Sequence, residues 1–123
     1  MEEAITRLIY PAIGDNKFRC ELIKRIQSSN GKAVSIIHPS AYVSPTVKIG
    51  IGVAVLPHAS VGTNVKIGDG CIVSMNTVVD HDTVLEVGVH IAPGAIVKGE
   101  NRIPSFTKIE SGVVVERGEF NNL

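Results

Sequence analysis

A repeat with a period of six residues runs through most of this chain and limits the folds open to it. From residue 37 onwards, every sixth residue is a branched aliphatic one. These fourteen positions are Ile37, Val43, Ile49, Val55, Val61, Ile67, Val73, Val79, Leu85, Ile91, Val97, Ile103, Ile109 and Val115. Ordinary amphipathic strands alternate with a period of two and turn at irregular intervals, so they would not keep this spacing. The period therefore predicts a solenoid in which each hexad supplies a short strand and a corner.

A second inward position follows each aliphatic by four residues and is mostly small or β-branched, as at Ala41, Val53 and Cys71. Only 4% of the residues are aromatic and tryptophan is absent, so Val, Ile and Ala must fill a narrow interior. Three hexads close one triangular coil, and residues eighteen apart then stack on one another. Residues 37–120 supply between four and five such coils.

The first 36 residues have a different pattern. Asp15 is a candidate N-cap, apolar residues follow it at helical spacing, and Gly31 is a candidate stop. Residues 8–10 could form a strand before this helix. We therefore divide the chain into an N-terminal segment, 1–36, and a repeat domain, 37–120. Because a solenoid has an open end, we expect the first segment to form a short α/β cap over the first coil.

Charge and cysteine content exclude several classes of partner. Twelve basic and twelve acidic residues cancel, which gives no reason to expect nucleic acid or an anionic membrane as a partner. The only cysteines, Cys20 and Cys71, have no disulfide or metal-ligand spacing, and free thiols fit a reducing compartment. No signal peptide or membrane-spanning apolar stretch is recognisable. We expect a cytoplasmic protein.

Three segments carry a likeness to a known family. IHPSAYVSP at 37–45, VDHDT at 79–83 and VHIAPGA at 89–95 resemble the sialic acid O-acetyltransferase and bacterial amino-sugar N-acetyltransferase family of hexapeptide-repeat enzymes. The likeness extends over residues 8–112. It implies left-handed winding of the coils, against the usual right-handed crossover rule. The expected fold is thus all-β, a left-handed parallel β-helix.

The family usually begins with a Rossmann-like domain that holds a sugar nucleotide, and residues 12–19 resemble the segment that leads from it into the repeat. We therefore expect residues 1–36 to be the tail of such a domain. The family also continues for several hexads beyond the point where this chain stops, soon after Val115. A truncated, non-catalytic trimer that acts as a scaffold or as part of a split enzyme stays open as the alternative to an active enzyme.

His81 is the candidate catalytic residue. It lies two positions beyond inward-facing Val79, between Asp80 and Asp82, and so should point outward from a corner. A histidine titrates near neutral pH, which suits a general base. The resemblance implies that it takes a proton from the acceptor amine or hydroxyl as that atom attacks the acetyl thioester. Asp82 would raise its basicity by stabilising the imidazolium.

The remaining candidates depend more heavily on the resemblance. It implies that His90 contacts acetyl-CoA, often across a subunit boundary, although a plain interface histidine is the alternative. It implies a main-chain contact of Ser111 with the cofactor. Ser74 stands where the family more often has Asn, and its hydroxyl could orient a histidine ring. His38 and His58 are interpreted as structural or surface residues.

The resemblance implies an acetyl-CoA-dependent acetyltransferase that modifies an amine or hydroxyl of a sugar or nucleotide-linked sugar. It also implies a homotrimer, with the cofactor in the groove between two neighbouring β-helices, because a monomer would hold half a site. Four cations could meet the phosphates of CoA, although solvent-exposed side chains are the simpler interpretation. These are Lys66, Lys98, Arg102 and Lys108.

Two other functions known on this kind of fold do not fit the pattern. A zinc carbonic anhydrase needs three histidines per metal, two of them about five residues apart. The gaps between the histidines here are 20, 23 and 9, so we expect no metal. An ice-binding β-helix would present outward arrays of threonine, whereas Thr77, Thr83 and Thr107 occupy inward positions.

Overall fold

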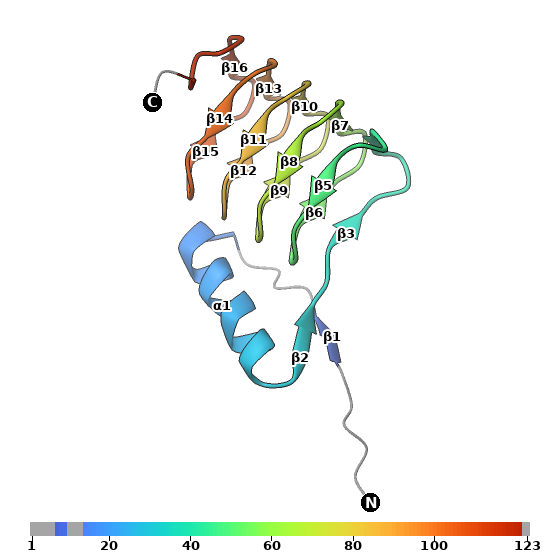
Figure 1. Ribbon diagram of the computed structural model, residues 1–123, viewed down its shortest axis with the longest axis vertical. Helices are drawn as coiled ribbons and strands as arrows, with labels where there is room; N and C mark the ends of the chain where they lie inside the picture. The colour runs from blue at the N-terminus through green and yellow to red at the C-terminus, as the bar shows by residue number, and fades with distance from the viewer. Residues whose placement is uncertain (1–6, 10–13, 122–123) are drawn as a thin grey trace, which may run out of the picture.

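The computed structural model describes residues 7–9 and 14–121 and confirms the left-handed parallel β-helix (Figure 1). Fourteen strands of two residues each wind three to a coil, which gives between four and five coils. The aliphatic residue that recurs every six positions is the second residue of each of these strands. The strands are β3 (Ile36–Ile37), β4 (Tyr42–Val43), β5 (Lys48–Ile49), β6 (Ala54–Val55), β7 (Ser60–Val61), β8 (Lys66–Ile67), β9 (Ile72–Val73), β10 (Val78–Val79), β11 (Val84–Leu85), β12 (His90–Ile91), β13 (Ile96–Val97), β14 (Arg102–Ile103), β15 (Lys108–Ile109) and β16 (Val114–Val115).

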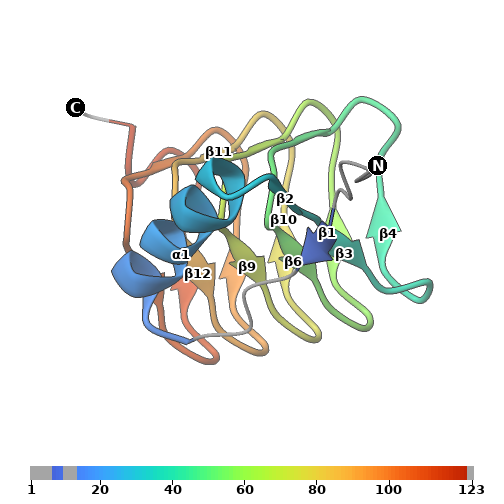
Figure 2. The same cartoon turned by 90° about the horizontal axis from the view of Figure 1, so that it is seen from below.

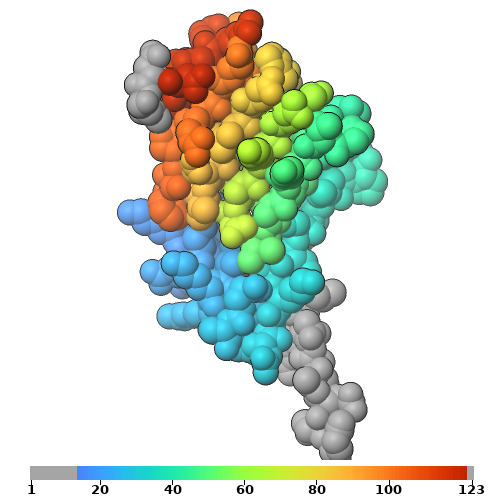
Figure 3. Space-filling model, in the orientation of Figure 1, coloured from blue at the N-terminus to red at the C-terminus, as the bar shows by residue number. Residues whose placement is uncertain are grey.

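The strands form three parallel sheets, which are the three faces of the prism. The β4 face contains β4, β7, β10, β13 and β16; the β5 face contains β5, β8, β11 and β14; the β3 face contains β3, β6, β9, β12 and β15. Residues eighteen apart pair in register, as Val79 does with Val61 and with Val97. The coils therefore stack directly, and the space-filling view shows them as successive bands (Figure 3).

The core is the narrow interior of the prism. The second residue of each strand points inward, and Val55, Val73 and Val97 have no exposed surface. The small inward positions are equally buried, as at Val65 and Cys71. Because every coil buries the same set of aliphatic side chains, each additional coil removes a similar amount of apolar surface from water.

The N-terminal segment contains the predicted strand and helix. β1 (Arg7–Ile9) pairs in parallel with β2 (Gly31–Ala33), and α1 (Asn16–Ser28) lies between them in sequence. The Asp15 side chain accepts a hydrogen bond from the Phe18 backbone N–H at 2.8 Å, which is the predicted N-cap. The helix ends before Gly31: Asn30 takes the left-handed conformation, with φ 65°, and Gly31 begins β2. The predicted strand residue Tyr10 lies outside the described residues.

The position of α1 differs from the expected cap. The helix runs beside the coils, along the corner between the β5 and β3 faces, which we call the helix corner (Figure 1, Figure 2). Arg19 is fully buried there and donates from Nε to the carbonyl oxygen of Gly70 at 2.7 Å. Among the described residues the first coil stays open, with the inward-facing Ile37 45% exposed.

Glycine explains why the helix packs on this corner. Gly52, Gly70 and Gly88 recur every eighteen residues and have φ between 63° and 71°, a conformation that disfavours side chains. A Cβ on Gly70 would lie 2.9 Å from the Cys20 Sγ, and one on Gly52 would lie 2.7 Å from Ile23. A column without side chains thus lets α1 approach the corners closely.

Asn101 ties the last coils together. It occupies the small inward position that holds Val47 and Val65 in earlier coils, and it is 2% exposed. Its Nδ2 donates to the carbonyl oxygens of Lys98 at 2.8 Å and Glu116 at 2.9 Å. Its Oδ1 accepts from the Phe120 backbone N–H at 2.8 Å. The amide therefore satisfies backbone groups that the end of the repeat leaves unpaired.

We expect Asn101→Val to lower the free energy of unfolding by about 1–3 kcal/mol, because valine fits the position but removes the partner of the Glu116 carbonyl oxygen and of the Phe120 N–H. Urea denaturation of both proteins measures the difference. The matched control is Thr83→Val in the coil before, whose hydroxyl makes three long bonds: 3.3 Å to the Lys98 carbonyl oxygen, 3.5 Å to the His81 carbonyl oxygen and 3.4 Å from the Asn101 N–H. An equal loss of unfolding free energy in the two variants would show that the Asn101 hydrogen bonds stabilise the fold no more than the long bonds of Thr83 do.

Candidate functional site

His81 lies on the corner between the β4 and β5 faces, which we call the histidine corner. The corner follows β10, whose second residue is buried, so the chain turns outward immediately after it. The Asp80 Oδ1 accepts a hydrogen bond from the His81 backbone N–H at 2.8 Å. Asp82 then takes a left-handed conformation, with φ 55°, and its N–H donates to the Thr63 carbonyl oxygen at 2.9 Å. The turn presents the His81 side chain, 41% exposed, to solvent.

The side chains of His81 and Asp82 form a close pair. The Nδ1 of His81 lies 2.8 Å from the Asp82 Oδ2. Because a carboxylate only accepts, the neutral ring carries its proton on Nδ1 and leaves the Nε2 lone pair available. The hydrogen bond to Asp82 raises the pKa of His81 above its ordinary value of 6.5, and the nearby Asp80 charge acts in the same direction. The same bond lowers the pKa of Asp82, which keeps it ionised.

Residues from the neighbouring coils surround this pair, and sequence reasoning missed both of them. Asn64, eighteen residues before Asp82, hydrogen-bonds to the Asp82 carboxylate and also lowers its pKa. Gly99, eighteen residues after His81, lies under the imidazole ring: a Cβ built there would be 2.6 Å from Nε2. The eighteen-residue stacking, which the repeat itself predicts, is the signal that could have found them.

His90 lies on β12, in the outward column of the β3 face. Its Nε2 is 3.2 Å from the Oγ of Ser74. Ser74 is 3% exposed, and its hydroxyl, which could orient a histidine ring, contacts His90 in place of His81. Burial lowers the pKa of His90, and the positive charges of Lys108 and Arg19 add to this effect. At neutral pH the ring is therefore uncharged and can donate or accept a hydrogen bond.

Ser111 is exposed on the third corner, between the β3 and β4 faces, beside Gly112 with φ 72°. The three sequence-predicted positions thus lie on different sides of one prism: His81 on the histidine corner, His90 on the β3 face and Ser111 on the third corner. A single chain does not bring them together.

Three of the four cations considered for CoA phosphates form ion pairs with carboxylates. Lys98 Nζ lies 2.8 Å from Glu116, Arg102 Nε lies 2.6 Å from Glu86, and Lys108 Nζ lies 3.7 Å from Glu110. All three side chains are about half exposed or more. Solvated surface pairs describe these residues better than a prepared phosphate site.

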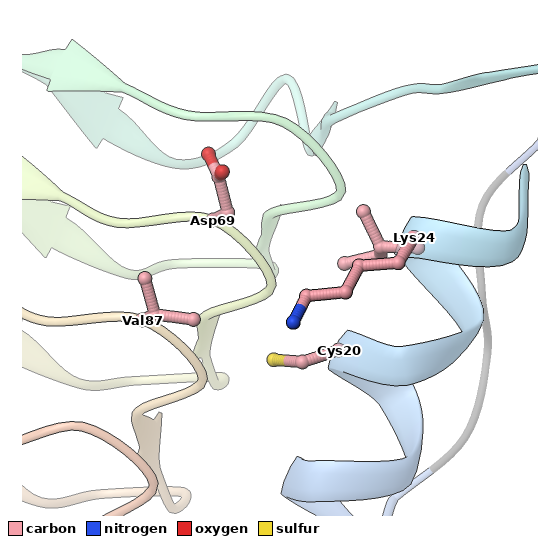
Figure 4. Close-up of a pocket in the computed structure, with 5 residues that line it drawn as sticks. Cys20, Lys24, Asp69 and Val87 are labelled. Carbon is pink, nitrogen blue, oxygen red and sulfur yellow. The ribbon is translucent and has the colours of Figure 1, made fainter. Parts of the chain in front are cut away.

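A pocket of about 260 Å³ lies between α1 and the helix corner (Figure 4). Cys20 and Lys24 point from the helix toward Asp69 and Val87 on the corner, and Ile23 completes the lining. None of these five residues belongs to the predicted site. The pocket belongs to the seam where the helix packs on the coils.

Two findings bear on cofactor and membrane. Within residues 7–9 and 14–121, His, Cys, Asp and Glu side chains nowhere gather in a group of three or more that could hold a metal ion. In the same part of the chain, no helix has the length and apolar character to cross a membrane.

Two solved structures resemble this chain over most of its length. A mutant of perosamine N-acetyltransferase from Caulobacter crescentus, in complex with CoA and GDP-perosamine, matches with a TM-score of 0.79 at 33% identity, over 90% of this chain and 61% of that chain. The acetyltransferase domain of PglB from Neisseria gonorrhoeae FA1090, in complex with acetyl coenzyme A, matches with a TM-score of 0.83 at 34% identity, over 86% of this chain and 52% of that chain. The chain is therefore similar to acetyltransferases in both fold and sequence.

Curated sequence relatives match a shorter part of the chain. The bifunctional protein GlmU from Syntrophotalea carbinolica is 34% identical over 67 residues, which is 54% of this chain and 14% of that protein. The acyl-(acyl-carrier-protein)–UDP-N-acetylglucosamine O-acyltransferase from Brucella ovis is 37% identical over 62 residues, 50% of this chain and 22% of that protein. The chain thus spans less than a quarter of the length of these two relatives. No family model matches it.

Proposed function

We propose that this chain is an acetyl-CoA-dependent acetyltransferase that modifies an amine or hydroxyl of a sugar or nucleotide-linked sugar, with His81 as general base. The observation that carries the proposal is the His81–Asp82 pair, with Nδ1 bonded to the carboxylate at 2.8 Å and the ring accessible on an outward corner. Its support comes from the likeness to acetyltransferases crystallised with CoA or acetyl coenzyme A.

The proposed reaction begins when the Nε2 lone pair of His81 accepts a proton from the acceptor N–H or O–H. The acceptor atom attacks the thioester carbonyl carbon, and the carbon–sulfur bond breaks as the tetrahedral intermediate collapses. The CoA sulfur leaves and takes the proton from Nε2, which returns the ring to its neutral form. Asp82 stays ionised throughout and stabilises the transient imidazolium.

We place the acetyl donor between neighbouring subunits of a homotrimer, because His81, His90 and Ser111 lie on different sides of one chain. His90 and Ser111 are the proposed donor contacts. The neutral, half-buried ring of His90 and the exposed backbone beside Gly112 suit hydrogen bonds to the amide groups of CoA.

The β4 face is the proposed contact between subunits. Its outward residues carry no charge and four of five are apolar: Tyr42, Ser60, Val78, Ile96 and Val114. The β5 face instead presents three cations in its outward column: Lys48, Lys66 and Arg102. This uncharged face adjoins the histidine corner, and a second copy can cover it at low desolvation cost.

The acceptor is the least defined part of the proposal. The complex of the Caulobacter neighbour with GDP-perosamine supports a nucleotide-linked sugar. If residues 1–36 belong to a sugar-nucleotide-binding unit, as predicted from the sequence, the acceptor would also be a nucleotide-linked sugar.

A direct test is the release of CoA thiol from acetyl-CoA when GDP-perosamine or another amino-sugar or hydroxy-sugar nucleotide is added. Acetyl-CoA binding by calorimetry and the oligomeric state are measured on the same sample. Acceptor-dependent release of CoA supports the proposal. A folded trimer that releases no CoA with any of these acceptors would favour the scaffold alternative.

The pH dependence should report the His81–Asp82 pair. Catalysis needs the neutral ring, so kcat/KM should fall as pH decreases through the raised pKa of His81. Asp82→Asn removes the cause of that rise, so the acid limb should move to lower pH while the rate at high pH falls at least about tenfold. The measurement is kcat/KM for acetyl-CoA from pH 5 to 9, with Asp80→Asn as the comparison, which should move the acid limb less because the Asp80 charge raises the pKa of His81 less than the hydrogen bond from Asp82 does. An acid limb unchanged in Asp82→Asn contradicts the assignment.

A further inference from the structure

The imidazole of His81 rests on a residue of the next coil that has no side chain. A Cβ built on Gly99 would lie 2.6 Å from Nε2, 2.9 Å from Cε1 and 3.0 Å from Cδ2 of His81. Real Cβ atoms essentially never approach other atoms more closely than 3.0 Å. Any other residue at position 99 would therefore displace the ring.

Backbone conformation does not explain this glycine. Six described glycines have left-handed φ values, between 63° and 75°, and Gly99 is not among them. Its backbone can be adopted by any L-residue without strain. The equivalent positions in other coils carry side chains, as at Pro45, Thr63 and Arg117. Glycine thus occupies this corner position in the coil that directly follows His81.

We infer that Gly99 is a positioning residue for His81: because it has no side chain, the imidazole lies against its backbone with Nδ1 turned to Asp82 and Nε2 left open. The inference rests on the proposed function, because this ring orientation affects activity only if Nε2 exchanges a proton with substrate. The first atom that an added methyl group would meet is Nε2 itself. A side chain here would thus both move the ring and occupy the space beside the atom that accepts the proton.

The geometry also predicts how the protein responds to a methyl group at this position. His81 is 41% exposed, so its ring can swing outward into solvent and relieve the contact without moving the backbone. That movement breaks the bond between Nδ1 and Asp82, since the pair depends on the ring orientation. The coils stay intact, because the bonds that join them here, such as Glu100 N–H to the His81 carbonyl oxygen at 3.0 Å, do not use the His81 side chain.

The test is Gly99→Ala, with Pro45→Ala as the control, because Pro45 is the exposed equivalent corner position three coils before Gly99. We expect the Cε1–H resonance of His81 in NMR spectra to titrate at lower pH in Gly99→Ala, because the pKa loses its increase from Asp82. The spectrum is assigned by comparison with His81→Ala. In the transfer assay, kcat should fall at least about tenfold with little change in KM for acetyl-CoA.

A double-mutant cycle keeps the inference testable whatever the activity. If the methyl group collides with the ring, any loss of stability on Gly99→Ala should disappear in the His81→Ala background. An unchanged titration of His81 in Gly99→Ala, or a stability cost that is the same in both backgrounds, would overturn the role of Gly99. Both readouts work even if the wild-type protein transfers no acetyl group, so the two proposals fail separately.

Discussion

Replacing His81 by alanine is expected to lower kcat/KM for acetyl transfer by about 10²- to 10⁴-fold, the contribution usual for a positioned general base. In the proposed reaction Nε2 takes the proton of the attacking amine or hydroxyl, and this nitrogen is left open because Nδ1 is bonded to Asp82. The rate of CoA thiol release with GDP-perosamine or another active acceptor measures the effect. Added imidazole should restore part of the rate, because the missing side chain leaves space above Gly99.

The fold should survive this change, because an outward corner side chain contributes little to packing. Thermal unfolding and the oligomeric state of His81→Ala should match those of the wild type. The control is His58→Asn, which changes another exposed corner histidine with no carboxylate partner in its described contacts and keeps a residue that tolerates its φ of 64°. Turnover in His81→Ala within threefold of the wild type would remove His81 from the catalytic role.

Most of the fold could be predicted because one short pattern repeats along it. The six-residue period places each aliphatic on the second residue of a strand, and the stacking of residues eighteen apart follows from three hexads per coil. The position of α1 could not be predicted in the same way. Asp15 predicts where the helix begins, but nothing local says which surface it covers. That depends on the glycine column at the helix corner, whose members are eighteen residues apart and far from the helix in sequence.

The candidate site likewise has contacts that the sequence predicts and contacts that it does not. The pairing of His81 with Asp82 was predictable because adjacent residues on a tight corner are held close by the backbone itself. The eighteen-residue stacking places Asn64 and Gly99 near the pair, but whether they contact it depends on side-chain orientation across the stack. Ser74 shows the limit: its hydroxyl could orient a ring, yet only the structure shows that the ring belongs to His90, sixteen residues later on the next coil.

A charge introduced on the β4 face should break the proposed trimer. Ile96 is the outward residue of β13, near the middle of this face, and is 36% exposed in the single chain. In the trimer it would be covered by a neighbouring copy, so Ile96→Glu would bury three unpaired carboxylates per assembly. Because each buried, unpaired charge costs several kcal/mol, we expect association to weaken at least about 100-fold. Sedimentation velocity at micromolar concentration should then show monomers in place of trimers.

The matched control is Val84→Glu, which places the same side chain at the outward position of β11 on the β5 face. Val84 pairs in register with Lys66 and Arg102, so a carboxylate there meets cations and should leave the assembly intact. If donor binding needs two subunits, acetyl-CoA affinity should fall in Ile96→Glu and not in Val84→Glu, although His81 and Asp82 are unchanged in both. A monomeric Ile96→Glu that binds acetyl-CoA as tightly as the wild type would show that one chain holds the complete donor site, and the subunit-boundary arrangement would be wrong.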